Sequence, residues 1–140
     1  MEHPACKTRS VSVLVVEDEA LISEWVSEVL EDEGFDVHTV ASAEEAVAYL
    51  DEADDVDVLF TDINLPGPMD GTRLAQVARA RKPQLGVIYA SGRLPSLDPH
   101  VRVPGSTFVP KPYMPSQIVM LIARLTNVGG GGFCSGSAPA

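Results

Sequence analysis

Short apolar runs alternate with longer amphipathic segments along this chain. Four runs, at residues 11–16, 56–61, 86–91 and 106–110, are rich in β-branched and aromatic residues and have the length of strands. A fifth segment, residues 35–40, alternates apolar and polar positions, which is typical of a strand at the edge of a sheet. The pattern therefore predicts five strands.

The segments between these runs have the apolar spacing of helices. Ser42 and Glu45 have the spacing of a capping box, which predicts the start of one helix. Asp70 or a neighbour starts another, and the last helix is expected to begin around residues 113–115. The first helix has an apolar stripe through which we expect Trp25 to pack onto the sheet. Its residues are Leu21, Ile22, Trp25, Val26, Val29 and Leu30.

Strict alternation of strands and helices favours a parallel sheet with helices on both faces. We predict an α/β protein with a flavodoxin-like, doubly wound sheet of five parallel strands in the order 2-1-3-4-5. In this order the first, third and fourth strands are central. Residues 11–16, 56–61 and 86–91 are the most continuously apolar runs, as buried strands must be.

One interval departs from this alternation. Residues 94–104 should contain the fourth helix, but they include Pro95, Pro99 and Pro104. A proline inside a helix removes a hydrogen bond and clashes with the preceding turn. We therefore expect at most a short or irregular fourth helix, on a mobile and weakly anchored segment.

Composition is consistent with one folded domain. The chain has 140 residues, of which 45% are hydrophobic, enough to bury a core. We expect a mobile tail at residues 1–9, a domain at residues 10–127 and a flexible tail rich in glycine and serine at residues 128–140.

The charge balance bears on partners and location. Twenty acidic residues against ten basic ones give a formal charge of −10, which disfavours direct binding to DNA. No apolar run is long enough to span a bilayer, and the first residues lack the pattern of a signal peptide. We expect a cytoplasmic protein that binds neither DNA nor membrane.

Reactive side chains follow the predicted strands. In such a sheet, sites form where the carboxyl ends of the strands meet. Glu17 and Asp18 end the first strand and Asp62 the third, its neighbour in the predicted order, so these carboxylates should lie close together. Crowded carboxylates repel unless a cation neutralises them, and Mg²⁺ prefers oxygen ligands of this kind. Ser91 and Lys111 end two further strands.

Four segments resemble the signature blocks of response regulator receiver domains, in the same order and at fitting intervals. They are residues 15–19, residues 60–67 with 69–71, residues 89–92 and residues 109–112. The resemblance covers roughly residues 10–127. It implies a CheY-like receiver of the stand-alone type, with no output domain following it.

The resemblance also implies roles for individual residues. Asp62 would accept a phosphoryl group from a phosphohistidine on a sensor histidine kinase or a phosphotransfer protein. Asp18 and Asp62 would supply carboxylates to Mg²⁺, Glu17 would act through a bound water, and the backbone carbonyl of Asn64 would complete the protein ligands.

Three further roles follow from the same resemblance. Ser91 would hydrogen-bond one phosphoryl oxygen and Lys111 would bind another. Phe108 would be the switch aromatic, which moves into the space that Ser91 vacates and alters the surface read by a downstream protein effector. Self-catalysed phosphorylation and dephosphorylation would be slow, so the chain would be a signalling phosphoacceptor and not an enzyme. The resemblance leaves open whether the protein forms a homodimer.

Two other function classes compete with this one. Residues 70–72 resemble part of the Asp-x-Asp-Gly-Thr motif of haloacid-dehalogenase phosphatases, but Pro68 stands where that nucleophile should be. A degenerate receiver that only binds partners is the other alternative. The presence of Asp18, Asp62, Ser91 and Lys111 together argues against lost chemistry.

Overall fold

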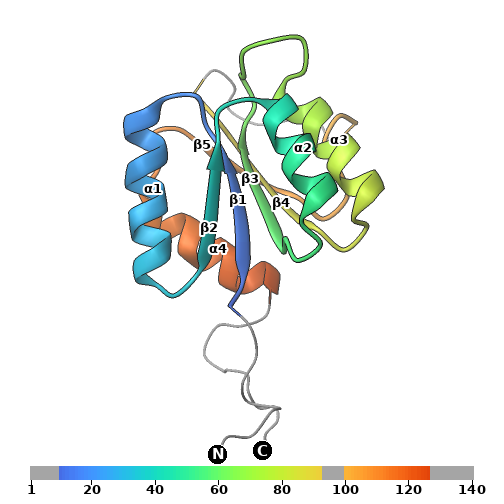
Figure 1. Cartoon of the computed structure of the whole chain (residues 1–140). Coiled ribbons are helices and arrows are strands. Elements are labelled where there is room, and N and C mark those ends of the chain that lie inside the picture. The colour runs from blue at the N-terminus through green and yellow to red at the C-terminus, as the bar shows by residue number, and fades with distance from the viewer. Residues whose placement is uncertain (1–9, 93–99, 127–140) are drawn as a thin grey trace, which may run out of the picture.

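Five parallel strands form the central sheet (Figure 1). The computed structural model describes residues 10–92 and 100–126, so the two predicted tails and much of the predicted fourth-helix interval lie outside the described residues. The strand order is β2-β1-β3-β4-β5, as predicted. The strands are β1 (Ser12–Val16), β2 (Asp36–Val40), β3 (Val58–Asp62), β4 (Gly86–Ser91) and β5 (Thr107–Pro110).

Helices cover both faces of this sheet. They are α1 (Ala20–Asp32), α2 (Ala43–Glu52), α3 (Gly71–Arg81) and α4 (Pro115–Thr126). Helices α1 and α4 pack on one face, and α2 and α3 pack on the other (Figure 1). The sheet thus separates two apolar cores, one on each face.

Burial follows the predicted hydrophobicity of the strands. All five residues of β1 and of β3 are buried, whereas β2 at the sheet edge is exposed or half-buried throughout. Strand β3 begins two residues later than predicted and includes Asp62. Asp57 lies just before β3, and its backbone N–H donates to the Ser12 carbonyl of β1. The Asp57 carboxylate in turn accepts from the Ser12 N–H at 2.8 Å.

Two helix starts are capped as the sequence predicts. Ser42 Oγ accepts from the Glu45 N–H at 3.2 Å, and Glu45 Oε1 accepts from the Ala41 N–H at 2.9 Å. Asp70 Oδ1 accepts from the Arg73 N–H at 3.0 Å and fixes the first turn of α3. Such caps satisfy amides that have no partner inside the helix.

The prediction that Trp25 packs α1 onto the sheet is wrong. Its side chain is 45% exposed, and that of Leu21 is 81% exposed. Val26 and Leu30 are the buried residues of α1. The apolar stripe of α1 is wider than the surface that the sheet can cover, so its outer part faces solvent.

The interval before β5 is better anchored than we expected. Among its described residues, 100–106, no helix is present. Val103 is nevertheless buried, and its N–H donates to the Tyr89 hydroxyl at 3.0 Å. Arg79 on α3 donates to the Pro104 carbonyl at 2.8 Å. A polar side chain on the sheet and another on α3 therefore hold this segment in place without a helix.

Candidate functional site

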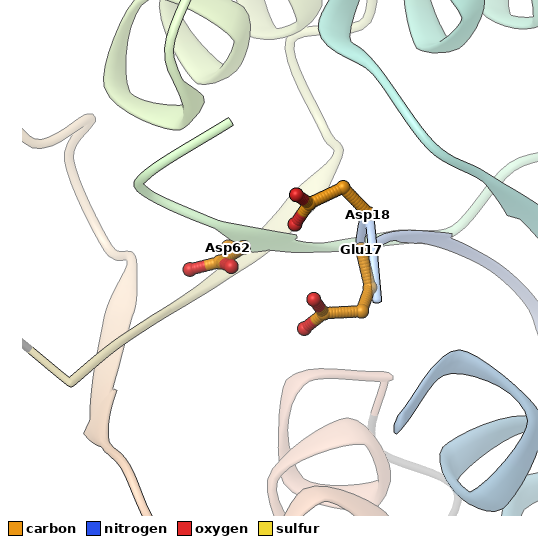
Figure 2. Close-up of side chains that lie close together, drawn as sticks. All are labelled: Glu17, Asp18 and Asp62. Atoms are coloured by element: carbon orange, nitrogen blue, oxygen red, sulfur yellow. The ribbon is translucent and has the colours of Figure 1, made fainter. Parts of the chain in front are cut away.

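Three carboxylates meet at the carboxyl ends of β1 and β3 (Figure 2). Glu17 and Asp18 follow β1, and Asp62 ends β3, which pairs directly with β1. One oxygen from each lies within 4.8 Å of the others. Glu17 and Asp62 are 6% and 8% exposed, whereas Asp18 is exposed. The structure thus brings together the three carboxylates that the sequence predicted to be neighbours.

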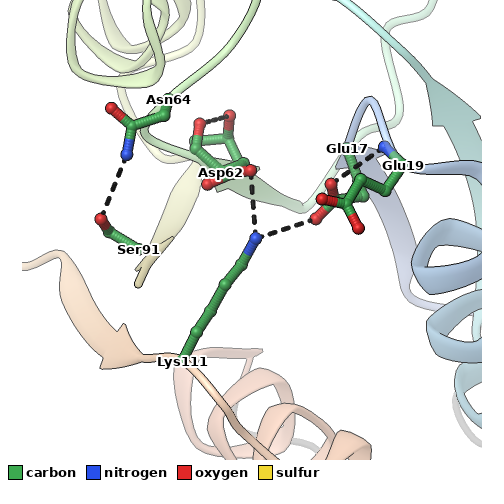
Figure 3. A network of polar contacts seen from close by, with 7 residues as sticks. Glu17, Glu19, Asp62, Asn64, Ser91 and Lys111 are labelled. Atoms are coloured by element: carbon green, nitrogen blue, oxygen red, sulfur yellow. Dashed lines mark hydrogen bonds and ion pairs between the residues drawn. The ribbon is translucent and has the colours of Figure 1, made fainter. Parts of the chain in front are cut away.

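Lys111 reaches this cluster from the end of β5 (Figure 3). Its Nζ lies 3.1 Å from Asp62 Oδ2 and 3.4 Å from Glu17 Oε1. The Glu19 N–H donates to the other Glu17 oxygen at 3.1 Å. The peptide bond from Lys111 to Pro112 is cis. One cation and one backbone amide therefore offset part of the negative charge in the site.

Burial and charge shift the pKa values of two of these groups. Burial raises the pKa of the Glu17 carboxyl above its ordinary value of 4.5, and the charge of Asp62 adds to this rise, while the Glu19 amide and Lys111 oppose it. Burial alone would lower the pKa of Lys111. Its hydrogen bonds and charge interactions with Asp62 and Glu17 outweigh burial and raise that pKa. Lys111 consequently stays protonated at neutral pH.

The predicted residues Ser91 and Asn64 lie beside each other at the same end of the sheet. Ser91 ends β4, is fully buried, and its Oγ accepts from Asn64 Nδ2 at 3.3 Å (Figure 3). Strand β4 pairs with β3 so that Ala90 is opposite Asp62, which places Ser91 next to the carboxylate cluster. The structure therefore positions a hydroxyl on the side of Asp62 away from β1.

Phe108 lies in a different environment from the other predicted site residues. It is half-buried on β5, opposite Tyr89 of β4, and packs against the core under α2 and α3. Within the described residues it belongs to apolar packing beside the site. Its role as a switch stays a prediction.

A comparison with known families identifies this arrangement. The family model described as "Response regulator receiver domain" matches residues 13–123, which include every predicted site residue. The chain belongs to this family. Members are signalling phosphoacceptors of two-component systems.

Individual relatives agree with this assignment. The chain is 35% identical over 113 residues to "Transcriptional regulatory protein AruR" of Pseudomonas aeruginosa, covering 76% of this chain and 46% of that protein. It is 32% identical over 121 residues to "Sensory transduction protein RegX3" of Mycobacterium tuberculosis, covering 85% and 52% respectively. The chain therefore spans about half the length of these curated relatives.

A solved structure has the same fold over most of its length. The crystal structure of a response regulator receiver protein from Sinorhizobium medicae matches with a TM-score of 0.80 and 31% identity, covering 84% of this chain and 95% of that one. Receiver architecture is thus shared well beyond the signature residues. In the part of this receiver that the structure describes, no helix is both long and apolar enough to cross a membrane.

The donor set of the receiver site suits a hard divalent cation. Two of the three carboxylates are buried, all their closest oxygens lie within 4.8 Å, and Lys111 is the one cation in contact with them among the described residues. Oxygen ligands with excess negative charge are what Mg²⁺ binds in proteins. The residues present therefore fit the metal that receiver domains use.

Sequence reasoning missed the apolar rim of this site. Ile22 and Trp25 of α1, Lys111, and Tyr113 line a cavity of about 380 Å³ next to the carboxylates. Tyr113 is buried there and its ring meets Phe60 edge to face, with centroids 5.6 Å apart. Burial and the charges of Glu17 and Asp62 raise the pKa of Tyr113, which keeps its phenol neutral. The i, i+3 spacing of Ile22 and Trp25 is the sequence signal that could have located this rim, but the same spacing also predicts packing in the core.

Proposed function

We propose that Asp62 is the phosphoacceptor of this receiver and takes its phosphoryl group from a phosphohistidine on a sensor histidine kinase or a phosphotransfer protein. The contact that supports this most strongly is the 3.1 Å approach of Lys111 Nζ to Asp62 Oδ2, within a cluster of three carboxylates. A buried carboxylate with a lysine and a metal-binding set beside it has the parts that phosphoryl transfer needs.

The proposed reaction is a displacement at phosphorus. An Asp62 oxygen attacks the phosphorus atom, an acyl phosphate bond forms, and the bond from phosphorus to the histidine nitrogen breaks. The electron pair of that bond stays on the imidazole. Lys111 offsets the charge of one phosphoryl oxygen, and the Ser91 hydroxyl donates a hydrogen bond to another. Ser91 ends β4 and Lys111 follows β5, so both side chains come from the same edge of the sheet as Asp62.

The metal ligands belong to the same proposal. Asp18 and Asp62 would hold Mg²⁺ through carboxylate oxygens, the Asn64 backbone carbonyl would be a further ligand, and Glu17 would act through a water. When bound, Mg²⁺ neutralises the phosphoryl oxygens that develop charge in transfer. Glu17 is buried and held by the Glu19 N–H, which suits an indirect role in orienting water.

The outcome of transfer is a change in protein contacts. A phosphoryl group adds charge and acceptor oxygens beside Ser91, and its contacts favour one of two arrangements of the neighbouring surface. We infer that a downstream protein binds that surface. Hydrolysis of the acyl phosphate, catalysed slowly by the receiver itself, then ends the signal. AruR is named a transcriptional regulatory protein and RegX3 a sensory transduction protein, and these names describe those two proteins.

Intact-mass spectrometry tests the proposed acceptor. Wild-type protein, incubated with acetyl phosphate and Mg²⁺, is expected to gain the mass of one phosphoryl group and to lose it again on standing. Asp62→Asn should gain none. Asp51→Asn is the matched control, since Asp51 is an exposed aspartate that pairs with Arg81 at 2.6 Å on another part of the surface.

Other outcomes distinguish the alternatives. A stable, stoichiometric phosphoryl group on Asp62→Asn contradicts the assignment. Continuous release of phosphate without a phosphorylated protein would indicate an enzyme. Wild-type protein whose mass never changes, in Mg²⁺ with a donor that phosphorylates other receivers, would indicate a degenerate receiver.

A further inference from the structure

Helix α3 begins directly against the backbone of the proposed phosphoacceptor. Its first residue, Gly71, is buried, and its N–H donates to the Ile63 carbonyl at 2.8 Å. A Cβ atom at Gly71 would lie 2.1 Å from the Asp62 carbonyl oxygen and 2.8 Å from Ile63 Cα. Ordinary van der Waals contact begins at 3.4 Å, and the opposing atoms are backbone. A residue with a side chain therefore cannot occupy this position unless the backbone moves.

The Asp62 carbonyl is also held from its other sides. The Thr61 hydroxyl donates to this oxygen at 2.9 Å, and Thr61 is fully buried. The Ile63 N–H donates to the Ala90 carbonyl at 2.9 Å, which ties the end of β3 to β4. Movement of this carbonyl away from Gly71 would therefore strain the Thr61 hydrogen bond or the pairing of β3 with β4 at Ile63.

Helix α3 is equally unable to withdraw. Asp70 caps it, with Oδ1 accepting from the Arg73 N–H at 3.0 Å and from the Thr72 hydroxyl at 2.8 Å. Leu74, Ala75 and Ala78 are fully buried in the core under the sheet. Retreat of the first turn would expose these side chains or break the cap. A side chain at residue 71 would consequently displace the end of β3 itself.

We propose that Gly71 is a positioning residue for phosphoryl transfer, which rests on the proposed function of Asp62. Its missing side chain lets α3 seat against the Asp62 backbone and fixes the direction of the Asp62 carboxylate. The three atoms nearest to a Cβ at Gly71 all belong to Asp62 and Ile63, whereas Asp18 and Lys111 follow β1 and β5. A shift at residue 71 therefore moves Asp62 relative to its lysine and its metal ligands, while those partners stay in place.

Gly71→Ala tests this role against a matched glycine. Displacement of a reacting group by about 1 Å costs on the order of 100-fold in rate, so we expect uptake from acetyl phosphate, in saturating Mg²⁺, to slow by roughly that factor. Mg²⁺ affinity should weaken several-fold, measured by calorimetry. Gly86→Ala is the control, because the atoms nearest to its Cβ would belong to side chains, Leu125 at 3.3 Å and Val58 at 3.5 Å, at the start of β4. Its uptake should equal that of the wild type within about twofold.

All rates are compared at a temperature where circular dichroism shows each variant folded. A folded Gly71→Ala protein that takes up the phosphoryl group at the wild-type rate overturns the positioning role, whatever its melting temperature. If Gly71→Ala does not fold, Thr61→Val tests the same carbonyl from its other side, and unchanged uptake there overturns the proposal. A wild-type protein that gains no phosphoryl group refutes the proposed function instead, so the two failures are distinguishable.

Discussion

Tyr89→Phe should loosen the segment before β5 without disabling the phosphorylation site. Tyr89 is fully buried in the middle of β4, and its hydroxyl accepts from the Val103 N–H at 3.0 Å. Burial raises the pKa of the Tyr89 phenol, so the hydroxyl stays neutral. Val103 is only 6% exposed, which leaves little access for water to replace the lost acceptor.

The size of the effect follows from this burial. Phenylalanine keeps the ring and its packing. The change leaves the buried Val103 N–H without an acceptor, which costs about 1–3 kcal/mol, and it also removes the hydrogen bond between the Tyr89 hydroxyl and the Ser106 side chain. For a urea dependence of about 2 kcal/mol per molar, the unfolding midpoint should fall by roughly 0.5–1.5 M. Local opening at residues 100–106 should become easier by a similar free energy, because the hydrogen bonds from Gln76 and Arg79 of α3 to this segment are exposed.

Urea unfolding and amide hydrogen exchange measure the two effects. Tyr49→Phe is the matched control, since Tyr49 is half-buried and stacks on His38 with ring centroids 3.9 Å apart. The Val103 amide should exchange faster in Tyr89→Phe and unchanged in the control, while uptake from acetyl phosphate stays near the wild-type rate. If Tyr89→Phe unfolds like the control and the Val103 amide keeps its protection from exchange, the hydrogen bond from Val103 to Tyr89 does not hold this segment.

Three further predictions concern the site and its rim. Mg²⁺ at a hundredfold excess over its dissociation constant should raise the free energy of unfolding by about 2.7 kcal/mol, seen as a higher melting temperature, and Asp18→Asn should lose most of this gain. Burial raises the pKa of Glu17 in the folded state, so its contribution to stability is full below pH 4.5 and is lost as pH rises through the folded pKa. In metal-free thermal melts Glu17→Gln should lack this decline with pH. A pH profile of Glu17→Gln that runs parallel to that of the wild type would contradict this prediction. Trp25→Ala should slow phosphoryl transfer from a sensor kinase about tenfold or more, because Trp25 lines the cavity beside Lys111. Uptake from acetyl phosphate should stay unchanged. An equal loss of rate with both donors would show a structural role for Trp25 instead.

The strand order and the carboxylate cluster could both be predicted from the sequence. Continuous apolar runs mark the central strands, and parallel strands end at one edge, so residues that follow different strands must meet there. Glu17, Asp18 and Asp62 needed no more than this rule. The capping residues Ser42 and Asp70 are equally local signals, because each acts within its own first turn.

Features that depend on side chains from distant segments could not be predicted. Proline positions excluded a regular helix before β5, but they could not show that the Tyr89 hydroxyl would anchor Val103. The apolar stripe of α1 gave no sign of which residues the sheet would leave uncovered, so Trp25 was misplaced. Likewise Gly71 shows its role only when the carbonyl of Asp62 is seen beside it.

The central claim is that residue 62 itself holds the phosphoryl group. Borohydride reduces an acyl phosphate to an alcohol, so treatment of the phosphorylated protein should convert Asp62 to homoserine, which tandem mass spectrometry locates within its peptide. We predict homoserine at position 62, dependent on Mg²⁺ and on the phosphoryl donor, with Glu17, Asp18 and Asp70 unchanged. Homoserine at another of these positions, or a phosphorylated protein without reduction at residue 62, would contradict the account.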